Sequence, residues 1–339
     1  MHSYLRNDAL GLKDNPHWKF SSVKDRLGKT VGKRVVKYAY RPFDIRWVFY
    51  EPLMIERGDH RWPIARHLFN LEDNLSLLVS RTGAAAGSPV WDVLFVANGI
   101  SDLNLFRRGG AFMFPLYLVP DEDELAFSST KAVNLSPQFL NALCSQLKLK
   151  PSTTGLPHGL TPEDIFHYAY AVFHSPGYRS RYAEFLKIDF PRLPLTGNLE
   201  LFRALARLGG EITALHLLES PKLDKPMTKF VGSSREVVKI GWVDDSVWIN
   251  AGGKKAATTP GTSGFQGVPE AVWNFHIGGY HVCEKWLKDR KGRTLTDEDI
   301  AHYHKIVISL SETIRLMSEI DQVIESHGGW PGAFAGDAK

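Results

Sequence analysis

Cysteine and long apolar runs are both scarce in this chain. Cys144 and Cys283 are the only two cysteines among 339 residues, which excludes a disulfide framework and a four-cysteine zinc site. No window approaches the roughly 20 apolar residues that cross a bilayer, and residues 1–16 contain no apolar core of a signal peptide. The sequence therefore predicts a cytoplasmic protein with no membrane partner.

A large excess of charge of one sign is also lacking. Lysine and arginine number 41 and aspartate and glutamate 37, which gives a formal net charge of +4. With 43% hydrophobic and 23% charged residues, the composition is that of a folded globular protein rather than a disordered one. The length is typical of about two subdomains. The slight basicity permits a nucleic-acid partner without requiring one.

Sequence motifs of catalysis are missing as well. The chain has no glycine-rich cofactor loop, no loop that grips an adenine for methylation, no nuclease carboxylate set and no nucleophile beside a base. Several potential metal ligands gather near the C-terminal end, but their spacing matches no zinc template: His276, His281, Cys283, His302 and His304. We therefore predict no catalytic, cofactor-binding or metal-binding residue in this chain.

Helix signals concentrate in the second half. Thr161, Pro162 and Asp164 are typical of a helix start, and apolar residues then recur at helical spacing on one face: Ile165, Phe166, Ala169, Val172 and Phe173. The segment 175–177, Ser-Pro-Gly, ends this helix. A second short helix follows, with apolar residues inward and cations outward: Tyr178, Tyr182, Phe185 and Leu186 against Arg179, Arg181 and Lys187. Residues 198–218 predict another amphipathic helix, weakened midway by Gly209 and Gly210.

A long helix is predicted from Thr296 to Gly328. Thr296 suits the N-cap, and three acids follow it at the positive end of the helix dipole. Apolar residues then step by three and four, in a seam that either packs within the chain or docks a companion protein: Ile300, Tyr303, Val307, Leu310, Ile314 and Met317.

Strand signals dominate the first half. Residues 45–50, 90–96 and 111–119 are rich in aromatic and β-branched side chains, and residues 237–240 and 247–249 flank a turn that predicts a hairpin. The predicted fold class is α+β, with a β-rich half followed by a helical half. We expect a basic N-terminal arm (1–38), a β-rich recognition subdomain (39–150), a helical scaffold (151–330) with a hairpin at 236–250, and a tail (331–339).

Basic residues cluster in three places. Residues 19–46 contain nine lysines and arginines against two acids, which favours either a phosphate-facing arm or a solvated linker. Residues 285–293 place cations beside a tryptophan, in either a phosphate-gripping or a plain surface turn. Residues 80–89 form a loop of small residues with one arginine, typical of either a base-reading loop or a hairpin connection. The predicted DNA-binding residues are Arg41, Arg46, Arg81, Arg179, Arg181, Lys285, Lys288, Arg290, Lys291 and Arg293.

Four long runs carry a resemblance to a known family. They are YRPFDIRWVFYEP (40–52), FPLYLV (114–119), EDIFHYAYAVFHSPGYRSRYAEFLKIDFPRLPL (163–195) and GVPEAVWNFHIGGYHVCEKWLKDRKGR (267–293). In this order they resemble the C-terminal specificity region of Type ISP restriction–modification enzymes. In that family one polypeptide carries nuclease, translocase, adenine methyltransferase and target-recognition parts, and the resemblance reaches only the last.

The resemblance implies a sequence-specific recognition module for double-stranded DNA in an anti-phage restriction–modification system. Such a module is not an enzyme alone. It positions a methyltransferase, in cis or in trans, on which S-adenosylmethionine is expected, and the companion portion can include the nuclease and translocase. Two alternatives stay open: a free-standing adenine methyltransferase or nuclease with an unrecognised site, and a structural subunit of a defence complex.

Overall fold

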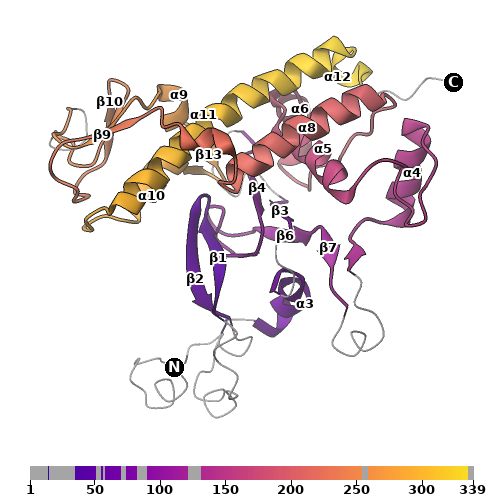
Figure 1. Ribbon diagram of the computed structural model, residues 1–339, viewed down its shortest axis with the longest axis horizontal. Coiled ribbons are helices and arrows are strands. Elements are labelled where there is room, and N and C mark those ends of the chain that lie inside the picture. Colours follow the sequence, from indigo (N-terminus) through magenta and orange to yellow (C-terminus); the bar gives the residue numbers. More distant parts are fainter. Residues whose placement is uncertain are drawn as a thin grey trace.

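The computed structural model describes residues 14, 35–50, 55, 58–69, 74–81, 90–120, 131–253 and 259–334. The basic arm up to residue 34, most of the loop 80–89 and the last five residues of the tail lie outside this set. Small sheets occupy the N-terminal part and long helices the C-terminal part, as Figure 1 shows. The predicted α+β class is confirmed.

Two three-stranded sheets form the β-rich part. In the first, with strand order β2-β1-β5, β1 (Val35–Arg41) pairs antiparallel with β2 (Asp44–Phe49) and parallel with β5 (Ile100–Ser101). In the second, with order β4-β3-β6, β3 (Ser76–Val79) lies between β4 (Leu94–Ala97) and β6 (Phe112–Pro115), both antiparallel. Helix α3 (Gly58–Phe69) lies beside these sheets (Figure 1).

The strand predicted over residues 111–119 is divided between two sheets. After β6 the chain enters β7 (Tyr117–Leu118), which pairs with β8 (Ala132–Val133). The buried side chain of Asn74 causes the break, because its Oδ1 accepts from the Tyr117 N–H at 3.1 Å and its Nδ2 donates to the Tyr117 carbonyl at 2.9 Å. A side-chain amide thus takes the place of a strand neighbour at Tyr117.

The helical part contains three long helices and several short ones. The long ones are α5 (Pro162–His174), α8 (Leu199–His216) and α11 (Asp297–Ser326). Reciprocal capping boxes, Thr161 with Asp164 and Thr296 with Asp299, begin α5 and α11 as predicted. The short helices are α4 (Pro137–Leu147), α6 (Pro176–Arg181), α7 (Ala183–Leu186), the 3-10 turn Pro221–Asp224, α9 (Glu270–Trp273), α10 (Val282–Lys288) and α12 (Gly329–Gly332).

Helix α5 is buried on almost every side, so the prediction of a single apolar face is wrong. Tyr168, Tyr170 and Ala171 are fully buried in addition to the predicted face. The phenol of Tyr168 donates to the Pro194 carbonyl at 2.8 Å and that of Tyr170 meets His216 at 2.7 Å. Because both phenols have hydrogen-bond partners, the side of α5 that carries these tyrosines can also be buried in the core.

The predicted hairpin exists, but its first strand is displaced. It consists of β10 (Gly241–Val243) and β11 (Ser246–Trp248) around Asp244 and Asp245, both with φ of 50°. It belongs to a four-stranded sheet with β12 (Gly264–Gln266) and β9 (Lys229–Val231). Val237 lies outside the hairpin because its N–H donates to the Arg293 carbonyl at 3.0 Å. A second small hairpin joins β13 (His276–Ile277) to β14 (Tyr280–His281).

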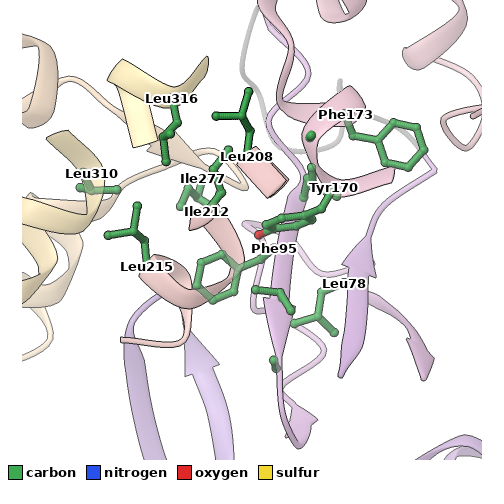
Figure 2. Packing of buried hydrophobic residues seen from close by; sticks show 14 of the residues in the cluster. Leu78, Phe95, Tyr170, Phe173, Leu208, Ile212, Leu215, Ile277, Leu310 and Leu316 are labelled. Carbon is green, nitrogen blue, oxygen red and sulfur yellow. The ribbon is translucent and has the colours of Figure 1, made fainter. Parts of the chain in front are cut away.

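One hydrophobic core runs from the sheets into the helices. Figure 2 shows Leu78 and Phe95 of the sheet close to Tyr170, with Leu208, Ile212 and Leu215 facing Leu310 and Leu316. Within the C-terminal seam, Tyr303, Val307 and Leu310 are fully buried. The seam therefore packs within the chain, and the alternative of a docking surface is wrong for these residues.

Candidate nucleic-acid interface

The structure brings the first predicted cations to the last ones. The antiparallel pair β1–β2, residues 35–49, which we name the ribbon, contacts α10 and the turn after it. Asp44 in the ribbon turn is only 3% exposed. Its Oδ2 accepts from Arg46 at 2.9 Å and its Oδ1 from Arg290 at 3.4 Å. Residues far apart in sequence thus share one buried carboxylate.

Further ion pairs extend this contact, which we name the joint. Arg290 also bonds Asp299 at 3.3 Å, and its guanidinium lies 3.5 Å from the centre of the Trp286 ring. Arg41 pairs with Asp102 at 3.2 Å, and Lys285 pairs with Asp289. The Phe43 carbonyl, at the tip of the ribbon, meets His302 Nε2 at 2.7 Å. The contacts of Asp44 with Arg290 and of Phe43 with His302 fix the ribbon on the C-terminal half.

The joint changes the role expected of its cations. Arg41, Lys285 and Arg290 are each mostly shielded from solvent and engaged by a carboxylate. A phosphate would have to displace that carboxylate, and removing one partner of a buried pair is costly. As the structure stands, Arg290 holds the ribbon on the C-terminal half and Arg41 ties it to the residue after β5. Lys285 is engaged by Asp289 at the end of its own helix.

Arg179 does not lie on the surface, so its predicted outward orientation is wrong, and a contact with DNA would require it to leave the core. The residue is 9% exposed and its Nε donates to the Phe173 carbonyl at 2.8 Å. Its guanidinium lies 5.6 Å from the Trp91 ring, and burial lowers its pKa to about 10, although the charge of Asp92 opposes this. The side chain is part of the core between α6 and the sheet.

Four of the predicted cations are exposed and make no ion pair with any described residue. They are Arg81 after β3, Arg181 at the end of α6, and Lys291 and Arg293 in the turn after α10. Lys288 is 55% exposed but pairs with Glu284 at 2.8 Å. The four exposed side chains can contact phosphates without first breaking an ion pair with a described residue.

Sequence reasoning missed a further basic turn. Arg107 and Arg108 are exposed and make no ion pair within the described part of the chain. The turn is anchored by the fully buried Leu105 and Phe106, and the Arg107 N–H donates to the Gly278 carbonyl at 2.7 Å. Arg108 itself has a φ of 66°. The two glycines that follow the arginine pair in the sequence were the available signal, since they indicate a tight turn with both cations at its tip.

Two buried histidines lie beneath Arg179 without forming a catalytic site. His216 Nε2 meets Thr313 Oγ1 at 3.1 Å, and that hydroxyl donates its own proton to the Ser309 carbonyl at 2.7 Å. His216 must therefore donate from Nε2 and accept at Nδ1 from the Tyr170 phenol. Burial lowers the pKa of His216 to about 3, and burial together with the Arg179 and His216 charges lowers that of His174 well below its ordinary value. Both rings are neutral core groups.

The described residues contain no group of three or more histidine, cysteine or acidic side chains arranged to hold a metal ion. The described helices likewise include none long and apolar enough to cross a bilayer.

Arg290 and Lys291, which are adjacent in the turn after α10, should affect stability differently when each is neutralised. Arg290→Met leaves the buried Asp44 short of a partner, so we expect a loss of about 3 kcal/mol in the free energy of unfolding. Lys291→Met changes an exposed side chain and should alter it by less than about 0.5 kcal/mol. Urea unfolding of the two variants measures both values. Equal stability of the two proteins would contradict a structural role for Arg290.

The model of the Type ISP C-terminal specificity domain matches residues 3–319. No curated protein matches the chain. Several solved structures are similar to it, among them three complexes with DNA or a DNA substrate mimic.

The first is the ATP-dependent Type ISP restriction–modification enzyme LlaBIII bound to DNA, with 20% identity and a TM-score of 0.67 over 94% of this chain and 21% of that one. The second is a DrdV–DNA complex, with 20% identity and a TM-score of 0.64 over 94% and 32%. The third is a nuclease-deletion mutant of the Type ISP enzyme LlaGI with a DNA substrate mimic, with 18% identity and a TM-score of 0.59 over 89% and 26%. At such identities the likeness shows a shared fold, and this chain spans at most about a third of each of those chains.

Proposed function

Because the chain belongs to the family of Type ISP C-terminal specificity domains, we propose that it recognises double-stranded DNA within a restriction–modification system. The observation that carries this proposal is the extent of the family match, which begins at residue 3 and ends at residue 319. The DNA-bound state of the structural neighbours supports it.

The distribution of charge in the described residues is consistent with this role. Six cations from several separate segments are exposed and lack a carboxylate partner among the described residues, as contacts with a polyanion require: Arg81, Arg107, Arg108, Arg181, Lys291 and Arg293. Cations already paired with acids would gain little from a phosphate, whereas these would release counterions from DNA on binding.

The proposal assigns catalysis to another part of the system. Methyl transfer with S-adenosylmethionine, and any translocation or cleavage, would be performed by a methyltransferase, nuclease or translocase portion in cis or in trans. The chain spans 21% of the first neighbour and 32% of the second, which leaves ample length in proteins of that kind for those parts. The role of this chain would then be to select the site and hold the DNA.

Removing two of the exposed cations should weaken DNA binding in a salt-dependent way. For the double variant Lys291→Ala, Arg293→Ala we expect lower affinity for every duplex sequence. The slope of log affinity against log salt should become shallower by about 0.9 for each phosphate that the variant no longer neutralises. Fluorescence anisotropy with a duplex of about 30 base pairs, long enough to cover a specific site, measures both quantities at several salt concentrations.

A matched control removes the same formal charge from an ion-paired surface. Arg207 and Arg315 are half-exposed and paired with Glu211 at 2.6 Å and Glu319 at 2.7 Å. Replacing both by alanine should leave the salt slope unchanged. An equal change in the two double variants would mean that only net charge matters and that the 290–293 turn is outside the interface.

A further inference from the structure

The outer face of the ribbon exposes large apolar side chains that no other described element covers. Trp47 is 66% exposed and Ile45 51%. Trp47 lies opposite Lys37 in the register of the two strands, and the Lys37 ammonium is 5.5 Å from the centre of the indole ring. Exposed apolar side chains that gather on one face, rather than being scattered singly, are typical of an interaction surface.

The opposite face of the ribbon is fixed in place. Val36, Tyr38 and Val48 pack on a small apolar cluster that includes Tyr50, with Ala65 and Leu68 of α3. At its turn, the joint holds Asp44 and Phe43 on the C-terminal half. The ribbon lies beside α3 (Figure 1). Because it is held both on α3 and at the joint, its outer side chains have defined positions.

The shape of the ribbon matches a DNA groove, and its outer face carries one cation without an ion pair among the described residues. The major groove admits a two-stranded β-ribbon, and β2 is the edge strand of its sheet, so no other described strand flanks that side of the ribbon. Arg41 and Arg46 of the ribbon are paired with Asp102 and Asp44, so Lys37 is the ribbon cation that remains available. Lys37 makes no ion pair among the described residues and is free to meet a phosphate or a guanine edge.

We propose that the outer face of the ribbon enters the major groove, where Trp47 reads thymine methyl groups and Lys37 anchors the ribbon beside them. This inference rests on the proposed function and adds the element and the residue that determine specificity. Apolar side chains distinguish thymine by contact with its C5 methyl group. Neither residue is among the DNA-binding residues predicted individually, although Lys37 lies in the basic stretch 19–46.

The test is a selection experiment with the full chain. The wild-type protein enriches duplexes from a random-sequence pool, and Trp47→Ala and Trp47→Phe are used in parallel. We expect all three to bind the unselected pool within about 2-fold of one another, since phosphate contacts dominate that binding. Trp47→Ala should bind the duplexes enriched by the wild type about 10-fold more weakly, an effect typical of one base contact, and Trp47→Phe should retain most of the preference.

Two controls make the result specific. Ile188→Ala removes another highly exposed apolar side chain, 74% exposed and distant in sequence from the ribbon, and should leave the enriched sequences unchanged. Replacing thymine by uracil at the enriched positions should weaken wild-type binding as much as Trp47→Ala does, and should not weaken that variant further.

The outcomes separate this inference from the proposed function. Wild-type protein that binds no duplex would overturn both. Enrichment that is the same for the wild type and Trp47→Ala would overturn the ribbon as a reading element and leave DNA recognition standing. Loss of self-association in the variant, with an unchanged preference for DNA, would show that the ribbon face docks a second copy of this chain and would also overturn the inference.

Discussion

Gly209→Ala should destabilise the chain by at least about 3 kcal/mol, and the protein should be largely insoluble at physiological temperature. Helices α5 and α8 cross at this residue. A methyl group on Gly209 would lie 1.9 Å from the His167 carbonyl oxygen, 2.7 Å from its carbon and 3.1 Å from the Ala171 nitrogen. All three are backbone atoms of α5, so the two helices would have to move apart.

The neighbouring glycine provides the matched control. A methyl group on Gly210 would meet only the His167 imidazole, at 3.2 Å from Nδ1, and a side chain can give way. Alanine in a helix interior gains about 1 kcal/mol over glycine, so Gly210→Ala should leave the free energy of unfolding within about 1 kcal/mol of the parent. Urea unfolding, or the soluble yield where Gly209→Ala does not fold, decides between them. Equal effects would mean that the helix crossing adjusts.

The second large effect is a loss of stability in mild acid. His174 and His216 are each 3% exposed, and both have a folded-state pKa far below the ordinary 6.5. Below about pH 6.5 these two histidines therefore bind protons in the unfolded chain but not in the folded chain. Stability from this source is complete above about pH 6.5 and is lost as the pH falls toward the folded pKa.

The expected size follows from the same linkage. Each buried histidine costs about 1.4 kcal/mol per pH unit below about pH 6.5, so each should cost about 2 kcal/mol between roughly pH 7.5 and pH 5, and the pair about 4 kcal/mol. The denaturant midpoint measured across this range tests the value.

Variants assign the pH effect to these residues. In His216→Gln, the slope of the free energy of unfolding against pH should be smaller by the contribution of one buried histidine, whatever the stability of the variant in mild base. His158→Gln, which changes an exposed ring, should keep the full slope. A wild-type slope near zero in mild acid would show that the buried rings accept protons, and would contradict the packing around Arg179.

Local signals in the sequence predicted the helices well. The starts of α5 and α11 depend on a cap residue and an acid three positions later, and such signals act within one turn of chain. The turn at Asp244 and Asp245 was equally local. The element boundaries that were wrong depend on distant partners: Asn74 breaks the strand at Tyr117, and Arg293 removes Val237 from the hairpin.

The same distinction explains the candidate interface. Residue type and clustering predicted a set of cations, but not which of them have an acid nearby in space. Arg290 meets Asp44 across 246 positions, and Arg179 lies against Trp91 and Asp92, far before it in the sequence. Helical spacing also could not show that Gly209, expected to weaken α8, is what allows α8 to contact α5 so closely.

The contact between Phe43 and His302 spans 259 positions, and this has a consequence for how the protein is made. Ribosomes add about 5–20 residues per second, so the ribbon would wait roughly 13–50 s for the helix that receives its tip. Until then the ribbon would be held by its pairing with β5 and its packing on α3 alone, and Asp44 would lack Arg290. A chain that ends before residue 302 would thus contain every residue of the ribbon but not the histidine that its tip contacts. Synthesis of α11 would be the step at which the tip of the ribbon acquires its fixed position.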